Sequence, residues 1–243
     1  MDALEQLGGE TWFRLGDRDM ATHLWRTCQL GAGRGLSEVT ADLAARMGVA
    51  AHIYPMSDDN VRTVVRCSEG ELPFQHYFVR HRCAPVVTGF SFEGISAARP
   101  SRNAMRLLQG GGVAAVVICP SNPYVSIDPI LQVPGLWLAL RDHPAPVILV
   151  SPIVAGAALK GPAAKMMVEL GVPATALGVA QHYRARYPGL VDYFVVDESD
   201  AKLAAGIGEL GFEVAVAPTV MTSREDKQRL ARFTLALGVE EQA

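Results

Sequence analysis

Residues 118–129 put hydroxyl and amide groups at the point where an apolar run ends. Ser121, Asn122 and Ser126 lie there among prolines, which stiffen the backbone. If a helix follows, its first N–H groups and these side chains suit phosphate or carboxylate oxygens. The alternative is a Ser/Asn/Pro turn that only caps a helix, and the residues taken alone favour that alternative.

Residues 151–167 offer a second place for an anion. Ser151 follows another apolar run, and Pro162 suits the first turn of a helix. Lys165 then lies near the start of that helix, with Lys160 in the loop before it. A helix N-terminus with ammonium groups attracts anions. The pattern of a P-loop is absent, and two solvated lysines are an equally good interpretation.

Residues 12–26 (WFRLGDRDMATHLWR) combine acidic, basic and imidazole side chains. In a helix, Asp19, His23 and Arg26 are spaced i, i+4 and i+7 and share one face. Arg14 comes just before that helix. Such a face binds a polar ligand, or its members bind one another. A salt-bridged surface helix is the more common outcome.

Asp58 and Asp59 are adjacent carboxylates in a polar turn. Carboxylate oxygens are ligands that Mg²⁺ prefers, so the pair is a candidate metal site. Ser-Asp-Asp is more often a turn in which the side chains bind their own backbone.

An α+β lobe is expected in residues 1–105. Its expected helices are residues 17–30 and 37–47, the first with Ala21, Leu24 and Cys28 as an apolar stripe and the second capped by Ser37 and ended by Gly48. Its expected strands are residues 51–56, 61–67, 74–79 and 86–92, of which the second and third form a hairpin.

A parallel sheet is expected in residues 106–243, because apolar runs alternate there with helical patterns. The expected strands are 113–119, 146–150, 193–196 and 213–216, and the expected helices are 129–141, 163–171, 174–186, 200–210 and 223–237. Ligands of such sheets bind at the carboxyl ends of the strands, where both polar turns described above lie.

Composition limits the function classes. Hydrophobic residues make up 49% of the chain and charged residues 19%, which excludes long disorder and a coiled coil. The formal net charge of −3 gives no basic excess for nucleic acid or an anionic membrane. The four cysteines form no C-x-x-C, and the N-terminus has no signal-peptide pattern. We therefore expect a cytoplasmic protein with reduced cysteines.

The segments LGDRDMATHLWRT, CPSNPYVSIDPIL and KGPAAKMM occur in the order seen in the 2-phospho-L-lactate transferases, with no large gap from about Leu7 to near the C-terminus. The chain resembles this family, which builds the deazaflavin coenzyme factor-420. The resemblance implies a Rossmann-like parallel sheet with helices on both faces and an inserted α+β lobe. It also implies that residues 1–105 form the deazaflavin side and residues 106–243 the nucleotide side.

The resemblance implies a reaction as well. A guanosine-diphosphate-activated three-carbon acid, phospholactyl or phosphoenolpyruvyl, is the donor. The terminal ribityl hydroxyl of the deazaflavin Fo attacks phosphorus, GMP leaves, and Mg²⁺ assists by neutralising charge. A homodimer is a further expectation.

The resemblance adds roles for some of these residues. Arg14 matches a deazaflavin-contacting position, and Ser121 and Asn122 match a family turn that is expected to face the nucleotide. The helix-face pattern makes Asp19 and His23 the other expected substrate-binding residues. The expected nucleotide- or phosphate-binding residues are Ser121, Asn122, Ser126, Ser151 and Lys165, although the family does not always have lysine at the last.

The chain departs from the family pattern in two ways. It lacks the family's Gly-rich G-G-T-G loop and its S-P-D-x-D-T element, so the first βαβ unit is expected to be missing, through truncation or a misassigned start, and transfer is expected to be poor. Asp128 replaces a usual glycine, which costs energy if the position needs a positive φ. A non-catalytic nucleotide-binding regulator and an inactive truncated paralogue are the alternatives.

Overall fold

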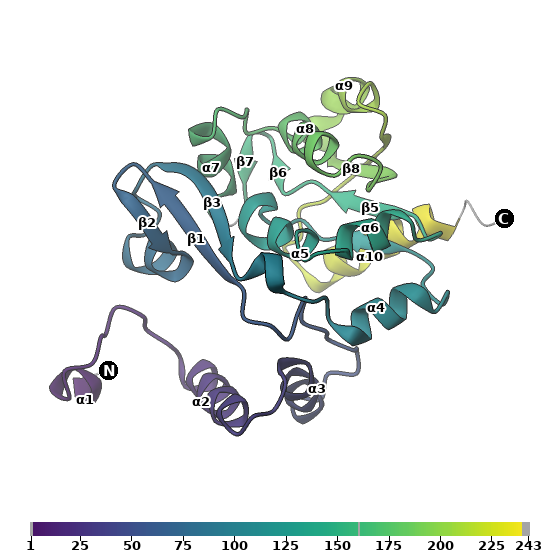
Figure 1. Cartoon of the computed structure of the whole chain (residues 1–243). Helices are drawn as coiled ribbons and strands as arrows, with labels where there is room; N and C mark the ends of the chain where they lie inside the picture. The colour runs from purple at the N-terminus through teal and green to yellow at the C-terminus, as the bar shows by residue number, and fades with distance from the viewer. Residues whose placement is uncertain (1, 160, 240–243) are drawn as a thin grey trace. The chain divides into compact units, whose positions relative to one another are not determined.

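The structure is a computed structural model that describes residues 2–159 and 161–239. The chain divides between Ala104 and Met105 into two compact units. Figure 1 shows the elements of both units along the chain. None of the described helices is long and apolar enough to cross a membrane.

The first unit combines helices with a small antiparallel sheet, in which β1 lies between β2 and β3. Its helices are α1 (Asp2–Gln6), α2 (Asp17–Gly31) and α3 (Leu36–Arg46), and α4 (Arg102–Gln109) begins at its end. Its strands are β1 (Arg62–Cys67), β2 (Gly70–Pro73) and β3 (Val87–Glu93), with short helical turns η1 (His76–Arg80) and η2 (Ile95–Ala97).

The two long helices of this unit were expected from the sequence, but the expected cap of the second is wrong. Ser37 does not cap α3, because the N-cap is Gly35 and makes no side-chain hydrogen bond. The expected apolar stripe of α2 is not buried: no residue of this helix is buried, and Leu24 is 66% exposed.

Two of the expected strands in this unit are also wrong. Residues 51–56 form no strand, and the neighbouring Ser57 makes only an isolated bridge to Pro100. Residues 74–79 are helical, since β2 ends at Pro73 and η1 follows. Proline has no N–H with which to continue a ladder, so the strand stops there. The hairpin itself forms through a tighter turn, with Cys67 opposite Gly70.

The second unit contains the predicted parallel sheet, with strand order β4-β5-β8-β9 in the described residues. Its strands are β4 (Val116–Ile118), β5 (Val147–Val150), β8 (Tyr193–Asp197) and β9 (Glu213–Ala217). All three pairings are parallel, which confirms the predicted fold class. A short antiparallel pair, β6 (Ile153–Val154) and β7 (Ala157–Ala158), follows β5.

Helices lie on both faces of this sheet (Figure 1). They are η3 (Pro123–Ile127), α5 (Asp128–Leu131), α6 (Leu136–Arg141), α7 (Ala163–Glu169), α8 (Ala176–Arg186), η4 (Glu198–Leu203), α9 (Ala204–Gly208) and α10 (Arg224–Val239). The expected single helix over 129–141 is wrong, because the chain breaks at Gly135, whose φ of 84° is left-handed.

Alternation along the strands builds a core on each face of the sheet. Ile148, Val150 and Val195 pack with Leu230 of α10 on one face. Leu149 and Phe194 are also fully buried and point to the opposite face. Strands covered on both sides explain the continuous apolar runs of the sequence, and their carboxyl ends carry the polar turns discussed below.

Candidate functional site

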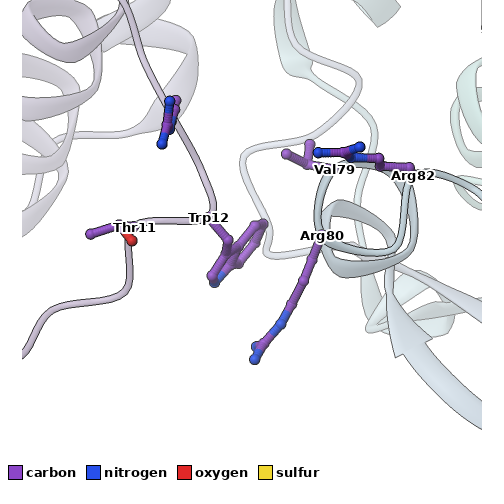
Figure 2. A pocket seen from close by; sticks show the side chains of 6 residues that line it. Thr11, Trp12, Val79, Arg80 and Arg82 are labelled. Carbon is purple, nitrogen blue, oxygen red and sulfur yellow. The ribbon is translucent and has the colours of Figure 1, made fainter. Parts of the chain in front are cut away.

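A cavity of about 600 Å³ opens in the first unit between the segment before α2 and the turn around η1 (Figure 2). Its lining residues are Thr11, Trp12, Arg14, Val79, Arg80 and Arg82. An indole and three guanidinium groups thus surround one space. Such a lining suits a ligand that is flat, aromatic and anionic.

The indole of Trp12 is held from two sides. Its Nε1 donates a hydrogen bond to Glu10 Oε2 at 2.8 Å. Its ring meets the His76 ring edge-on, with centroids 4.7 Å apart. The Arg80 guanidinium lies over the same indole, 5.9 Å from the ring centroid. Figure 2 shows Trp12 projecting from its segment toward the turn that carries Arg80.

The turn that carries Arg80 and Arg82 has an unusual backbone. Arg82 and Cys83 both have positive φ angles, 49° and 59°, which side-chain-bearing residues rarely adopt. The Cys83 N–H donates to the Tyr77 carbonyl at 2.9 Å, and Tyr77 is fully buried. The anchored Tyr77 therefore stabilises a strained turn, and strain of this kind is common at binding sites.

Of the three residues expected to bind a substrate, Arg14 lines this cavity. His23 instead lies 2.8 Å from Arg26, ring Nδ1 to Nη2, on the exposed surface of α2. Asp19 is exposed in the first turn of the same helix. The helix therefore has the paired polar face that was the alternative interpretation, and the substrate roles of Asp19 and His23 remain predictions.

The two carboxylates considered for magnesium are occupied by hydrogen bonds. Asp58 accepts from the Ser37 backbone N–H at 2.5 Å and from its hydroxyl at 3.0 Å, so it caps α3 from a distant turn. Asp59 accepts from the Arg99 N–H at 2.8 Å, and this bond lowers the pKa of Asp59. This arrangement does not fit a metal site. Across the described residues, no three His, Cys, Asp or Glu side chains cluster closely enough to hold a metal ion.

At the carboxyl end of β4, Asn122 acts as a helix cap. Its Oδ1 accepts hydrogen bonds from the N–H groups of Tyr124 and Val125, at 3.0 and 3.4 Å. Its amide nitrogen lies 3.2 Å from the sulfur of Met166 in α7. Ser121 is half-buried beside it and Ser126 is exposed. The side-chain oxygen of Asn122 therefore already accepts two backbone hydrogen bonds. The expected role of Asn122 in binding the nucleotide stays a prediction.

At the carboxyl end of β5, Ser151 is buried and its hydroxyl donates to the Ile153 carbonyl at 2.9 Å. Lys165 forms an ion pair with Glu169 at 2.5 Å, one turn further along α7. Its ammonium group is thus drawn along the helix away from its start. Lys160 lies outside the described residues. The anion-binding roles of Ser151 and Lys165 remain predictions.

Sequence reasoning missed a buried polar cluster around Asp128. Asp128 Oδ1 lies 3.0 Å from His182 Nε2 and accepts a hydrogen bond from the Tyr187 hydroxyl at 3.0 Å. Arg186 Nε lies 3.4 Å from the other oxygen. The φ of Asp128 is −51°, so this position requires no positive φ and the expected cost is absent. Burial, and then the Asp128 charge, raise the pKa of Tyr124 to about 12.

A second missed carboxylate, Asp197, ends β8. It accepts hydrogen bonds from the N–H and hydroxyl groups of both Ser199 and Thr219, at 2.7 to 3.1 Å. Burial alone would raise the pKa of Asp197, but these four bonds together lower it. The bonds join the ends of β8 and β9, and the sequence signal for this role was the Asp-x-Ser spacing of a helix cap.

Residues 2–214 match the family model described as 2-phospho-L-lactate transferase CofD. The chain belongs to this family. The resemblance drawn from its sequence motifs is therefore confirmed.

Among relatives of this CofD-family protein, a phosphoenolpyruvate transferase of Kitasatospora aureofaciens is 39% identical over 95% of this chain and 71% of its own length. A 2-phospho-L-lactate transferase of Methanosarcina acetivorans is 37% identical over 97% of this chain and 74% of its own length. A crystal structure of a Bacillus halodurans UPF0052-family protein matches with a TM-score of 0.60 at 14% identity, covering 86% of this chain and 70% of that one. That likeness concerns the fold alone.

Proposed function

We propose that the protein transfers a phospholactyl or phosphoenolpyruvyl group from a guanosine-diphosphate-activated donor to the deazaflavin Fo, in the synthesis of coenzyme factor-420. The observation that carries this proposal is the similarity, over nearly the whole chain, to transferases named for each of these two acids. The Trp12 cavity supports it, because the reaction requires a place for an aromatic, polar substrate.

The chemistry is a phosphoryl transfer. The terminal hydroxyl oxygen of the Fo ribityl chain forms a bond to the phosphorus that carries the three-carbon acid. The bond from that phosphorus to the oxygen bridging the diphosphate breaks, and GMP leaves with this oxygen. The proton of the hydroxyl passes to solvent. Positioning and charge neutralisation supply most of the catalysis in such reactions.

We also propose roles for individual residues in this reaction. Arg14, in the Trp12 cavity, is assigned to the deazaflavin side, with Asp19 and His23 following it on α2. Ser121, Asn122, Ser126, Ser151 and Lys165 are assigned to the nucleotide side, because parallel sheets bind ligands at this edge. Magnesium would neutralise the diphosphate, but Asp58 and Asp59 do not fit it, so we assign it no ligands among the described residues.

The decisive experiment incubates the protein with Fo, Mg²⁺ and each guanosine-linked donor separately, and follows the release of GMP. We expect slow release that depends on Fo, in line with the poor transfer expected from the sequence, and faster release with one of the two donors. A parallel reaction with excess chelator tests the need for magnesium.

A protein that binds the donor but releases no GMP under all of these conditions would contradict the proposed reaction. That result would favour the alternatives, a non-catalytic nucleotide-binding regulator or an inactive paralogue. We also propose that the protein acts in the cytoplasm and as a homodimer. Cell fractionation and light scattering of the purified protein test these two points.

A further inference from the structure

The turn that follows β4 is held at both of its ends, and the groups at its far end have no role in the proposed reaction. At its start, the Asn122 side chain accepts hydrogen bonds from two backbone N–H groups. At its end, Asp128 is buried beside His182. We propose that Asp128 and His182 are positioning residues, which hold this turn in the geometry that binds the diphosphate of the donor. The choice of ligand rests on the proposed function, which assigns Ser121, Asn122 and Ser126 to the nucleotide side.

The backbone of this turn is unusual. η3 is a single turn of π-helix, in which the Ile127 N–H donates a hydrogen bond to the Asn122 carbonyl at 3.3 Å. Such turns are rare, and many of them lie at functional sites. Asp128 follows directly and begins α5. A movement of Asp128 therefore reaches the whole turn through one continuous, hydrogen-bonded stretch of backbone.

His182 of α8 (Figure 1) contacts both ends of the turn. Its ring meets the Tyr124 ring edge-on, with centroids 5.0 Å apart, and the Tyr124 N–H is one of the donors to the Asn122 side chain. Its Nε2 lies 3.0 Å from Asp128 Oδ1 at the other end. One imidazole thus connects the capped start of the turn to its buried end.

The Asp128 carboxylate is held from three directions by α8 and the residue that follows this helix. Besides His182, the Tyr187 hydroxyl donates to Oδ1 at 3.0 Å, and Arg186 Nε lies 3.4 Å from Oδ2. Directional bonds to both oxygens leave the carboxylate one favoured position. Apolar side chains of similar volume would fill such a space with equal or greater stability. The particular effect of this cluster is therefore a fixed geometry for the turn.

A fixed turn matters for the donor and not for the acceptor. Phosphate oxygens are bound through short, directional hydrogen bonds, so a small displacement of the binding groups weakens them. The diphosphate is bound both before and during the transfer, and a loss of such uniform binding raises the KM while kcat changes little. Fo is assigned to the first unit, whereas the Asp128 cluster lies in the second. The KM for Fo should therefore stay unchanged.

The test compares four variants of the full-length protein, Asp128→Ala, Asp128→Asn, His182→Leu and Tyr187→Phe. Asp128→Asn keeps an acceptor oxygen for the Tyr187 hydroxyl. Tyr187→Phe removes a single hydroxyl and carries the test if Asp128→Ala does not fold. The matched control is Phe212→Ala, which removes a buried ring packed against Phe194 at the opposite, amino-terminal edge of the sheet.

The dissociation constant of GDP is measured by calorimetry, and GMP release gives kcat and the KM values for the donor and for Fo. Asp128→Ala and His182→Leu should raise the GDP dissociation constant and the donor KM about tenfold, with kcat and the KM for Fo within about threefold of the wild type. Asp128→Asn should recover most of the loss, and Tyr187→Phe should fall between. Phe212→Ala should lower the melting temperature as well, because it leaves a cavity, but keep the donor KM of the wild type.

A cluster that only stabilises the fold gives a different result. Wild-type GDP affinity and donor KM in all four cluster variants would overturn the proposal. It would also be overturned if Phe212→Ala, at an equal loss of melting temperature, raised the donor KM as much as Asp128→Ala does. Equal rises in the KM for the donor and for Fo would overturn it too.

The same measurements separate this proposal from the proposed reaction. A wild-type protein that binds GDP but releases no GMP would contradict the reaction, and the GDP affinities of the variants would still decide the role of Asp128 and His182. Normal turnover of the wild type, with an unchanged donor KM in the cluster variants, would overturn the positioning role and leave the reaction standing. A wild-type protein that neither binds GDP nor releases GMP would overturn both.

Discussion

The Asp128 carboxylate and the His182 imidazole lie 3.0 Å apart, although 54 residues separate them in the chain. Asp128 begins α5, directly after the η3 turn that Asn122 caps, and His182 lies in α8. Their side chains are only 7% and 12% exposed. The pair therefore fixes the turn at the carboxyl edge of the sheet to a helix from a distant part of the chain.

Replacing Asp128 by alanine should lower the free energy of unfolding by about 2–4 kcal/mol. The change leaves the Tyr187 hydroxyl and the His182 ring without their buried acceptor, and unpaired buried groups are costly. Urea unfolding measures the difference. Asp142→Ala is the control, because its ion pair with Arg141 is exposed and such pairs contribute little. Equal midpoints for the two variants would refute a stabilising role for the cluster.

Asp197 should make the protein sensitive to acid. Its folded pKa is lowered from an ordinary value of 3.8, so its stabilising effect is present above that pH. The effect is lost as the pH falls below that value toward the folded pKa. The gap in unfolding free energy between the wild type and Asp197→Asn should therefore be wide near neutral pH and narrow in acid. Urea unfolding over a pH series measures it, with Asp142→Asn as control. A gap that is constant with pH would contradict this account.

Asn122 should contribute through its side-chain oxygen. Asn122→Ala removes the acceptor for two backbone N–H groups, and losing a cap costs about 1 kcal/mol of stability. Asn122→Asp keeps an acceptor oxygen and should recover most of the loss in a thermal melt. If Asn122 also faces the nucleotide, the alanine variant will raise the KM for the donor more than its loss of stability explains. A KM like that of the wild type would limit Asn122 to the cap.

The sequence predicted the sheet of the second unit better than the rest of the fold. Leu149 and Phe194 lie in continuous apolar runs, which are typical of strands covered on both faces. Both side chains are buried in the structure, as this pattern predicts. The pattern of residues 74–79 also resembles a strand, but Pro73 ends β2 and the chain turns helical. Local patterns do not show which partner strand is within reach, and that explains the error.

The same limit applies to the candidate site. Arg14 was found through a family motif, whereas Arg80 and Arg82 have no local signature. They line the Trp12 cavity only because the turn after η1 approaches the N-terminal segment. Asp128 was noticed as a change from glycine, yet its partner His182 belongs to a helix whose packing the sequence does not specify.

Glu10 should control the Trp12 cavity without touching a ligand. Glu10→Ala frees both the Trp12 indole and the Arg80 guanidinium, so the bound ligand should lose roughly threefold to tenfold in affinity. Glu10→Gln keeps acceptor capacity for the indole and should bind more tightly than the alanine variant. Glu5→Ala, an exposed change in α1, serves as control. Calorimetry with Fo and with GDP measures the effect, and equal affinities in all three variants would show that Glu10 does not organise the cavity.

Asp58 should act as a cap for α3 and not as a metal ligand. Asp58→Ala removes the acceptor for the Ser37 N–H and hydroxyl, and should lower the stability by about 1 kcal/mol. Asp58→Asn keeps one acceptor oxygen and should lose less. The melting temperature of each protein is then compared with and without millimolar Mg²⁺, because an ion bound to the native state raises it. If Asp58 is only a cap, Mg²⁺ will shift the wild type and Asp58→Ala by the same amount. A shift that is present in the wild type and absent in Asp58→Ala would make Asp58 a metal ligand, and its bonds to Ser37 would then have to open when the ion binds.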